Sequence, residues 1–437
     1  MAVTTHREID ELLETWSTLT ADERLEAFTR LPRDLGDDFF LELSSRDQLQ
    51  LIRLVPAGER RIWLRLLPPD DTAELIRLAS ETERAELLEQ LDPVARREVN
   101  ALLAYKEDAA GGLMNPRFAR LRPEMTVDEA ISYLRRQAEL VETIYYAYAL
   151  GDDQRLLGVV SFRDLFSADK SKTVRDVMRK SFVSATDDVD QETVAKLVAQ
   201  HHLLAIPVLD AEGHMKGIVT VDDIVHVVEE EASEDIQRLG GMEALDAPYL
   251  QIGFWSMVKK RGGWLAVLFL GEMLTATAMG HFEHEIAQAV VLALFVPLII
   301  SSGGNSGSQA TTLVIRAMAV REVGLRDWWR VIRRELMCGI VLGSLLAIIG
   351  MARILTWQAI WKSYGQHYFV VALTVAASLT GVVTFGTIAG SMLPFILRRA
   401  GLDPASASAP FVATLVDVTG LIIYFTIASI ILRGTLL

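Results

Sequence analysis

Two acidic residues lie within strongly apolar stretches of the sequence. Asp417 is in PFVATLVDVTGLIIY, which has no lysine or arginine nearer than Arg433, and Glu272 is in LFLGEMLTATAM. An ionised carboxylate inside a membrane helix is costly, so each residue is a functional candidate by default. Asp417 could be neutral, paired with a group on another helix, or exposed to a cation in a water-filled path. For Glu272, a neutral acid or a pairing with an arginine of a neighbouring helix is favoured over pore lining.

A third candidate is the glycine-rich segment SGGNSGSQ, which contains Gly303, Gly304, Asn305, Gly307 and Gln309. Glycine permits close backbone approach, and the amide side chains offer neutral donors and acceptors. The segment is therefore either a tightly packed pore mouth or a seam between packed helices. Composition alone does not separate these two interpretations.

These residues belong to a hydrophobic half of the chain with five stretches long enough to cross about 30 Å of hydrocarbon. The expected spans are 263–280, 286–302, 336–355, 368–397 and 410–432. Basic residues gather before the first span, between the second and third, and after the fourth, so these loops are expected to face the cytoplasm. With five spans, the N-terminus is then cytoplasmic and the C-terminus lies outside.

Charge divides the 437-residue chain into two unlike parts. Residues 1–250 contain 49 acidic and 29 basic residues, a net charge of −20, whereas residues 251–437 contain 8 acidic and 14 basic residues, a net charge of +6. An acidic segment of this kind repels nucleic acid and anionic lipid, so its expected ligands are cations or basic partners. No nucleic-acid partner is expected. The single cysteine, Cys338, excludes an intrachain disulfide and is expected to be a small buried hydrophobe.

The first part of the acidic region reads as a series of short helices. Recurring helix starts are expected 11 to 13 residues apart, at Ser44, Pro56, Pro69, Ser80 and Asp92. This pattern predicts a small helical solenoid, which is either a docking and sensing surface or simply a packed domain with a solvated face.

From Ala110 the pattern changes to alternating strands and helices with an internal repeat. LGVVSFRDLF at 157–166 aligns with KGIVTVDDIV at 216–225, a period of about 60 residues. The stretch resembles paired CBS domains, which commonly bind adenine nucleotides. The resemblance would give that role, and with it possible ATP binding, to Ser161, Asp164, Thr220 and Asp223. The same Ser/Thr-x-x-Asp pattern is also an ordinary helix cap.

Several longer segments, in their order along the chain, resemble the MgtE family of magnesium channels. They are YKEDAAGGLM, EASEDIQRLGG, PLIISSGGNSGSQATTLVIRA and GSMLPFILRRAGLDPASASAPFVATLVDVTGLIIYF. The resemblance implies a homodimer in the lipid membrane whose helices enclose a central pore, with Asp417 of each subunit facing the ion. Mg²⁺ gives up its water reluctantly and is usually bound by one or two carboxylates, which suits such a pair.

The resemblance also implies inhibitory Mg²⁺ sites between the helical domain, the CBS pair and a connecting helix. The acids at the matching positions are Asp70, Glu74, Asp190, Glu192, Asp223, Glu231, Glu234 and Asp235. The alternative is a solvated acidic surface. His202 and His226 stand where further acids are expected. Imidazole is a poor ligand for Mg²⁺, so inhibition is expected to be weaker or pH-sensitive, unless both are ordinary surface histidines.

The predicted fold is multidomain. It comprises an all-α N-terminal domain (1–109), an α/β tandem CBS pair (110–170 and 171–228), a connecting helix (229–262) and a five-helix transmembrane pore domain (263–437). The predicted function is a magnesium-selective channel or transporter of the cell membrane that is gated by intracellular Mg²⁺. The alternatives are a CBS-containing membrane sensor and a transporter for Co²⁺ or Mn²⁺. An enzyme is not expected, because the sequence has no P-loop, HExxH motif or nucleophile elbow.

Overall fold

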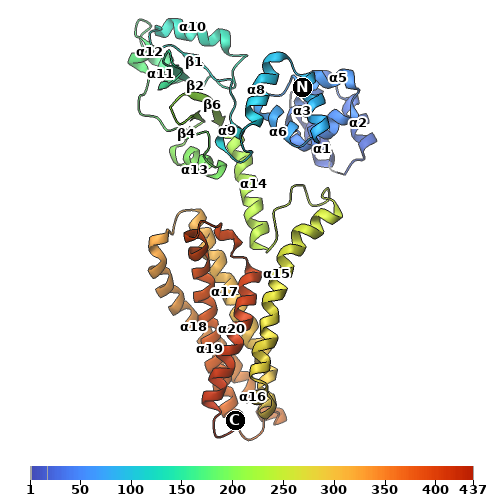
Figure 1. The fold of residues 1–437 in the computed structure, drawn as a ribbon, viewed down its shortest axis with the longest axis vertical. Coiled ribbons are helices and arrows are strands. Elements are labelled where there is room, and N and C mark those ends of the chain that lie inside the picture. Colours follow the sequence, from blue (N-terminus) through green and yellow to red (C-terminus); the bar gives the residue numbers. More distant parts are fainter. Residues whose placement is uncertain (1, 17, 437) are drawn as a thin grey trace. The chain divides into compact units, whose positions relative to one another are not determined.

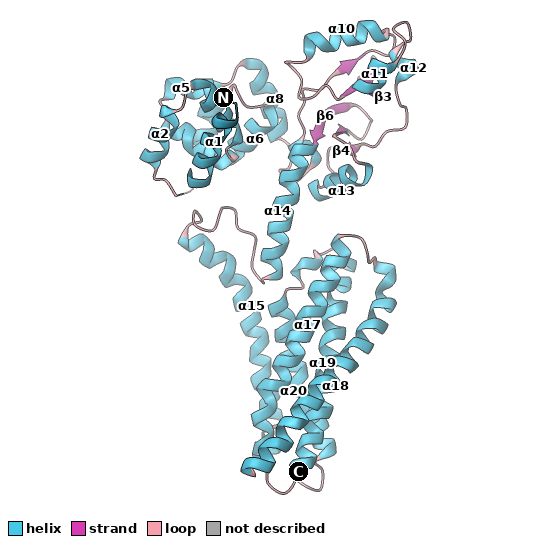
Figure 2. Cartoon of the chain, turned by 180° about the vertical axis from the view of Figure 1, so that it is seen from behind, coloured by secondary structure: helices cyan, strands magenta, loops and turns pink. Residues whose placement is uncertain are grey.

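The computed structural model describes residues 2–16 and 18–436 and divides the chain into two compact units, Met1–Glu229 and Glu230–Leu437. Every described strand belongs to the first unit, and the described elements of the second unit are all helical (Figures 1 and 2). The predicted fold class is confirmed: a helical N-terminal region, a CBS pair and five apolar helices follow one another along the chain.

The N-terminal region consists of short helices around an aromatic core. They are α1 (Ala2–Trp16), α2 (Ala21–Arg30), α3 (Arg33–Glu42), α4 (Ser45–Leu54), α5 (Ala57–Leu64), α6 (Pro69–Arg77), α7 (Glu81–Gln90) and α8 (Pro93–Leu103). Phe39 and Phe40 are fully buried, and their rings contact Trp16 and Trp63 respectively.

The predicted helix starts agree with the observed N-caps at Ser44, Pro56, Ser80 and Asp92. The start predicted at Pro69 is one residue late, because Pro69 is the first helical residue and Pro68 is the cap. Proline is favoured at that first position because it lacks an N–H group that the helix would leave unpaired anyway.

The CBS pair contains two sheets of the same topology. Its elements are α9 (Ala110–Leu113), β1 (Arg120–Leu121), α10 (Val127–Gln137), β2 (Tyr146–Leu150), β3 (Leu156–Ser161), α11 (Phe162–Ser167), α12 (Val174–Val177), β4 (Ala185–Thr186), α13 (Gln191–His201), β5 (Ala205–Leu209), β6 (Met215–Thr220) and α14 (Val221–Leu239). In each sheet a short strand pairs in parallel with the central strand, which pairs antiparallel with the third. The repeated sequences therefore occupy equivalent places, β3–α11 and β6–α14.

The connecting helix differs from the prediction at both ends. A helix was expected over 229–262, but α14 already begins at Val221 and ends at Leu239, and residues 254–262 belong to the next helix. The early start reflects apolar residues that continue the helical period into the CBS core, where Ile224 and Val227 are buried. The early end reflects Gly240 and Gly241, because Gly241 has φ +73°, a conformation that glycine adopts without strain.

The second unit contains the five predicted apolar helices (Figure 1). Its elements are α15 (Phe254–His281), α16 (Glu283–Gln288), η1 (Val290–Phe295), α17 (Val296–Ala319), η2 (Leu325–Asp327), α18 (Trp328–Trp361), α19 (Tyr368–Arg399), η3 (Pro404–Ser406) and α20 (Ala409–Ile431). The second span begins at Val290, four residues later than expected, and α17 continues through the glycine-rich segment to Ala319, as expected from the sequence SQATTLVIRAMA. Cys338 is exposed on α18, so its predicted burial is wrong.

Tryptophan pairs mark the two ends of α18. Trp328 contacts Trp329 at one end, and Trp357 contacts Trp361 at the other. At 1.5 Å per residue the two pairs are about 42 Å apart along the helix. That separation matches the thickness of a bilayer including its headgroup regions, where tryptophan is enriched.

Glycine allows α17 and α19 to touch backbone to backbone. A methyl group on Gly386 or Gly390 of α19 would overlap the carbonyl oxygen of Gly303 or Gly307 of α17. Thr311 Oγ1 then donates a hydrogen bond across the contact to the Gly390 carbonyl at 2.8 Å. Small residues at a spacing of four are a common device for close packing of membrane helices.

We expect Gly386→Ala to lower the thermal stability of the detergent-solubilised protein by several degrees. The added methyl group meets fixed backbone, and overpacking of this kind costs about 1–3 kcal/mol. Gly262→Ala is the matched control, because nothing lies within 4 Å of its Cβ position. Equal melting temperatures for the two variants would contradict the packing of α17 on α19.

Candidate functional site

A cavity of about 420 Å³ lies between α15, α17 and α20. Each helix contributes one face to the lining, because the lining residues are three, four or seven positions apart within a helix. Its polar lining residues are Glu272 and Thr275 from α15, Ser301, Asn305 and Ser308 from α17, and Asp417 from α20. The structure therefore brings both membrane carboxylates to one cavity.

Asp417 is half-buried in the third turn of α20. The helix begins at the N-cap Ser408, whose hydroxyl accepts a hydrogen bond from the Phe411 N–H group. Val412, Val416 and Gly420 form the buried face of the helix, and Asp417 lies beside that face. Among the described residues, no lysine or arginine forms an ion pair with Asp417 or with Glu272, so neither carboxylate is neutralised within the protomer.

The glycine-rich segment of α17 serves both purposes that the sequence left open. Gly303 and Gly307 pack against α19, whereas Gly304, Asn305 and Ser308 line the cavity. The helix thus has a packing face and a polar face on opposite sides.

A second group of acids lies within the first unit, where the helical region meets the CBS pair. The buried Asn115 donates hydrogen bonds through Nδ2 to Asp70 Oδ1 at 3.0 Å and to Glu142 Oε2 at 2.7 Å. Asp71 and Asp223 are close enough to repel Asp70. Of the predicted regulatory residues, Asp70 and Asp223 are therefore brought together, and the exposed Glu74 lies near enough to affect Asp71.

The acids of this group, Asp70, Asp71, Glu142 and Asp223, have raised pKa values. Burial, followed by repulsion from neighbouring acids, raises the pKa of Asp70 well above its usual value and that of Asp71 to about 7. Burial is also the main cause that raises the pKa of Glu142 and Asp223. Because like charges in a poorly solvated site oppose one another, the group favours bound protons or a bound cation near neutral pH.

Sequence reasoning missed Asp71, Glu142 and Asn115. Asp71 directly follows the predicted Asp70 in the sequence PDD, so this adjacency could have identified it as a further acid of the group. Asn115 belongs to the segment LMNP, which resembles CBS domains but did not mark it as a site residue, and Glu142 belongs to no motif. Only the tertiary fold brings them to Asp70.

The remaining predicted regulatory acids have local roles in the structure. Asp190 caps α13 by accepting from the Glu192 N–H group at 3.0 Å, and Glu192 forms an ion pair with Lys196 one turn later. Glu231, Glu234 and Asp235 all lie on α14 and all take part in polar contacts. Within the second unit, Arg238 pairs with both Glu234 and Asp403, and Asp403 precedes η3 and α20.

Both proposed nucleotide motifs act as helix caps. Ser161 Oγ accepts from the Asp164 N–H group at 3.0 Å. Thr220 donates to Asp223 through its hydroxyl at 2.7 Å and its N–H group at 3.0 Å. Capping therefore accounts for Ser161, Thr220 and Asp223 in this structure, whereas the Asp164 carboxylate forms an ion pair with Arg179 at 3.2 Å.

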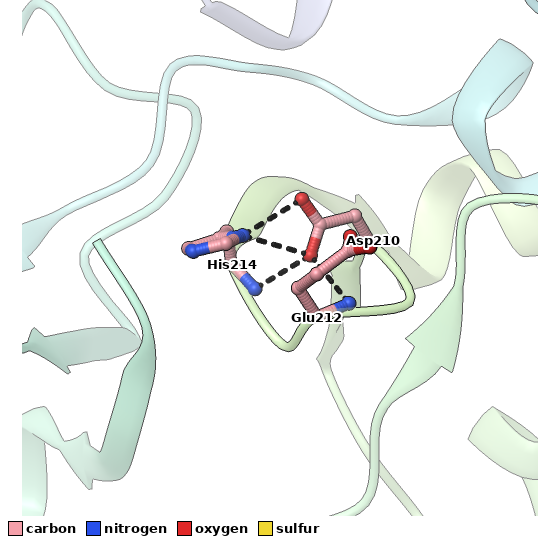
Figure 3. A group of neighbouring side chains, drawn as sticks. All are labelled: Asp210, Glu212 and His214. Atoms are coloured by element: carbon pink, nitrogen blue, oxygen red, sulfur yellow. Dashed lines mark hydrogen bonds and ion pairs between the residues drawn. The ribbon is translucent and has the colours of Figure 1, made fainter. Parts of the chain in front are cut away.

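The histidines offer no buried metal site. His202 ends α13 in the left-handed conformation, and His226 lies on α14 near Asp223; both are exposed. Asp210, Glu212 and His214 lie close together in the turn between β5 and β6 (Figure 3). The Asp210 carboxylate already accepts hydrogen bonds from the N–H groups of Glu212 and His214 and pairs with Lys216. The group is therefore explained as a turn that these contacts stabilise.

Family models match most of the chain. The MgtE intracellular N domain matches residues 7–108, the CBS domain matches 110–171 and 174–230, and the MgtE divalent cation transporter matches 296–427. The predicted resemblance is thereby confirmed.

Relatives of similar length carry the same family name. The magnesium transporter MgtE of Thermus thermophilus is 39% identical over 97% of this chain and 93% of its own length. That of Bacillus subtilis is 33% identical over 90% and 85%. An inosine-5'-monophosphate dehydrogenase of Methanocaldococcus jannaschii is 32% identical, but over only 24% of this chain and 20% of its own.

Among solved structures, the cytosolic domain of the Mg²⁺ channel MgtE in complex with ATP is 39% identical, with a TM-score of 0.48. The match covers 50% of this chain and 90% of the chain in the solved structure. The matches to the family models and to full-length relatives establish that this chain belongs to the MgtE family of divalent cation transporters.

Proposed function

We propose that the chain forms a Mg²⁺ channel or transporter in which Asp417 is the ion-binding residue of the path. The observation that carries this proposal is a carboxylate without an ion pair among the described residues, which lines a cavity with further polar groups among the membrane helices. Mg²⁺ keeps several waters and binds through one or two carboxylates, so Asp417 can hold it without a closed protein cage. In a homodimer, two copies of Asp417 would neutralise the divalent charge.

We infer that the acidic group around Asp70 and Asp223 is part of the Mg²⁺ sensor. Repulsion among these acids separates the helical region from the CBS pair at low Mg²⁺, and a bound cation holds them together at high Mg²⁺. The pairs from Arg238 to Glu234 and Asp403 connect α14 to the loop that leads into α20. Movement of α14 would thereby reach the helix that carries Asp417, opening the path at low Mg²⁺ and closing it at high Mg²⁺.

The proposed topology places the N-terminus and the acidic unit in the cytoplasm and the C-terminus outside, following the positions of the basic loops. No enzymatic activity is proposed. Nucleotide binding at the CBS pair would require Thr220 and Asp223 to exchange their present hydrogen bonds for ligand contacts. Ion flux in proteoliposomes separates a transporter from a non-transporting sensor, and competition with Co²⁺ and Mn²⁺ defines its selectivity.

Replacement of Asp417 by alanine is expected to abolish Mg²⁺ uptake while the protein remains folded, because it removes the only acid of α20. Flux into liposomes and size-exclusion chromatography measure the two properties. Asp417→Asn keeps the shape and removes the charge, so residual but less selective flux would assign the carboxylate to selectivity. Normal Mg²⁺ uptake by a well-folded Asp417→Ala protein would rule out the pore assignment.

The melting temperature of a 1–239 fragment in metal-free buffer is expected to rise by several degrees as the pH falls from 8 to 5.5. Acids whose pKa is raised in the folded state bind protons there that the unfolded chain releases, so stability falls as pH rises through the folded pKa, about 7 for Asp71. Mg²⁺ should stabilise more at pH 8 than at pH 5.5. Asp71→Asn should weaken the pH dependence of the melting temperature and the pH dependence of the stabilisation by Mg²⁺. The control Glu86→Gln changes an exposed acid and should leave both unchanged. Identical pH profiles for these two variants would contradict the role of the acidic group.

The double variant Asp71→Asn/Asp223→Asn is expected to conduct at low Mg²⁺ and to remain open at high Mg²⁺. Removing charge relieves the repulsion among these acids, but it also removes the ligands through which a bound ion bridges the domains, and a two-state gate needs roughly 5.5 kcal/mol to switch fully. Liposome flux at low and high cytoplasmic-side Mg²⁺ measures the effect. If the variant still closes at high Mg²⁺, the acids are only a solvated surface and have no gating role. If the path is shut at both Mg²⁺ concentrations, repulsion among the acids controls the gate.

A further inference from the structure

Glu272 is the second carboxylate at the cavity, and it reaches the cavity from a different helix than Asp417 does. It lies on α15 with Thr275 and Met279, which are three and seven residues later and line the same space. These spacings place the three side chains on one face of the helix. The orientation of Glu272 therefore follows from the helical register of α15.

The contact between α15 and α20 brings the two carboxylates to the same level. A methyl group on Gly271 would lie 3.0 Å from Thr414 Cγ2, so the two helices are in close contact there. Glu272 directly follows Gly271, and Asp417 is three residues, less than one turn, after Thr414. The backbone positions of both acids thus lie within one helical turn of the contact between Gly271 and Thr414.

The alternative role, pairing with an arginine of a neighbouring helix, finds no support among the described residues. Glu272 has neither an ion pair nor a hydrogen bond from a side chain there, and the nearest cation in its own helix is Arg261. Arg261 is 11 residues away, about 16 Å along the helix. The buried hydroxyl of Thr275, one turn from Glu272, also lacks a hydrogen-bond partner.

The cavity has the size and lining for a hydrated cation. Six waters occupy about 180 Å³ at about 30 Å³ each, less than half of the 420 Å³ available. Carboxylates, hydroxyls and the Asn305 amide can accept hydrogen bonds from the waters of such an ion. Glu272 is exposed in the single chain, but an ionised carboxylate in a membrane helix is costly, and a divalent cation shared with Asp417 would offset that cost.

We propose that Glu272 is a second cation-binding residue, which holds the hydrated Mg²⁺ through its water shell together with Asp417 and sets the affinity of the path for divalent ions. This inference rests on the proposed role of Asp417. It differs from that role in predicting a division of labour: Asp417 is required for conduction, whereas Glu272 determines how tightly the hydrated ion is held.

The test is Mg²⁺ flux by the full-length protein in liposomes, measured over a range of Mg²⁺ concentrations for Glu272→Gln, Glu272→Asp and Asp417→Asn. Glu272→Gln should raise the KM for Mg²⁺ at least fivefold and leave the maximal rate within about twofold, with Glu272→Asp in between. Hexaamminecobalt(III), whose ligands do not exchange, probes binding through the outer shell, and its inhibition constant should rise in parallel. Glu335→Gln is the matched control, because Glu335 is an acid of membrane helix α18 that does not line the cavity.

The outcomes separate this inference from the proposed function. An unchanged KM and unchanged block in Glu272→Gln, with flux lost in Asp417→Asn, would overturn the role of Glu272 alone. A fall in maximal rate at constant KM would assign Glu272 to helix packing and would likewise overturn it. Normal flux and normal Mg²⁺ dependence in Asp417→Asn would instead refute the proposed function.

Discussion

A carboxylate that is removed from water must take up a proton, find a cation or pay a large free-energy penalty, and this constraint recurs in both units of the protein. Among the membrane helices it applies to Asp417 and Glu272, which lack ion-pair partners among the described residues of the protomer. In the first unit it applies to the acids around Asp70, where burial and mutual repulsion raise the pKa. Both places would gain from a bound cation, and the proposed function assigns the first to the ion path and the second to the sensor.

The two sites differ in their surroundings. The membrane cavity has a volume of about 420 Å³, and its lining groups other than the two carboxylates are neutral. At the group around Asp70, the buried Asn115 already donates to two carboxylates and fixes their positions. A path needs weak binding so that the ion can leave, whereas a sensor needs affinity that changes the packing of domains. The contrast in surroundings suits these separate tasks.

Local signals predicted the fold well, and long-range contacts limited the prediction of the sites. Ser44, Ser80 and Asp92 were identified as helix starts because a cap is a short-range pattern. Asp417 and Glu272 were identified because apolar sequence makes a charge conspicuous. Glu142 could not be identified, since it lies in no motif and its partner Asn115 is 27 residues away. The connecting helix was misplaced because its charged part hid the apolar residues with which α14 begins inside the CBS core.

The glycine-rich segment shows how packing and selectivity depend on the same helix. Mg²⁺ requires oxygen positions about 2.0–2.1 Å from the ion in a near-ideal octahedron, whereas Ca²⁺ accepts longer and more variable distances. A path that prefers Mg²⁺ or its ordered water shell therefore needs walls that do not relax. On α17, Gly303 and Gly307 contact the backbone of α19 and the side chains of Val382, Val412 and Val416, which leaves little space for the helices to shift. The opposite face carries Asn305 and Ser308 into the cavity. Close contact behind the wall thus holds the polar groups in front of it, and under the proposed function it would supply the rigidity that discrimination between the two ions requires.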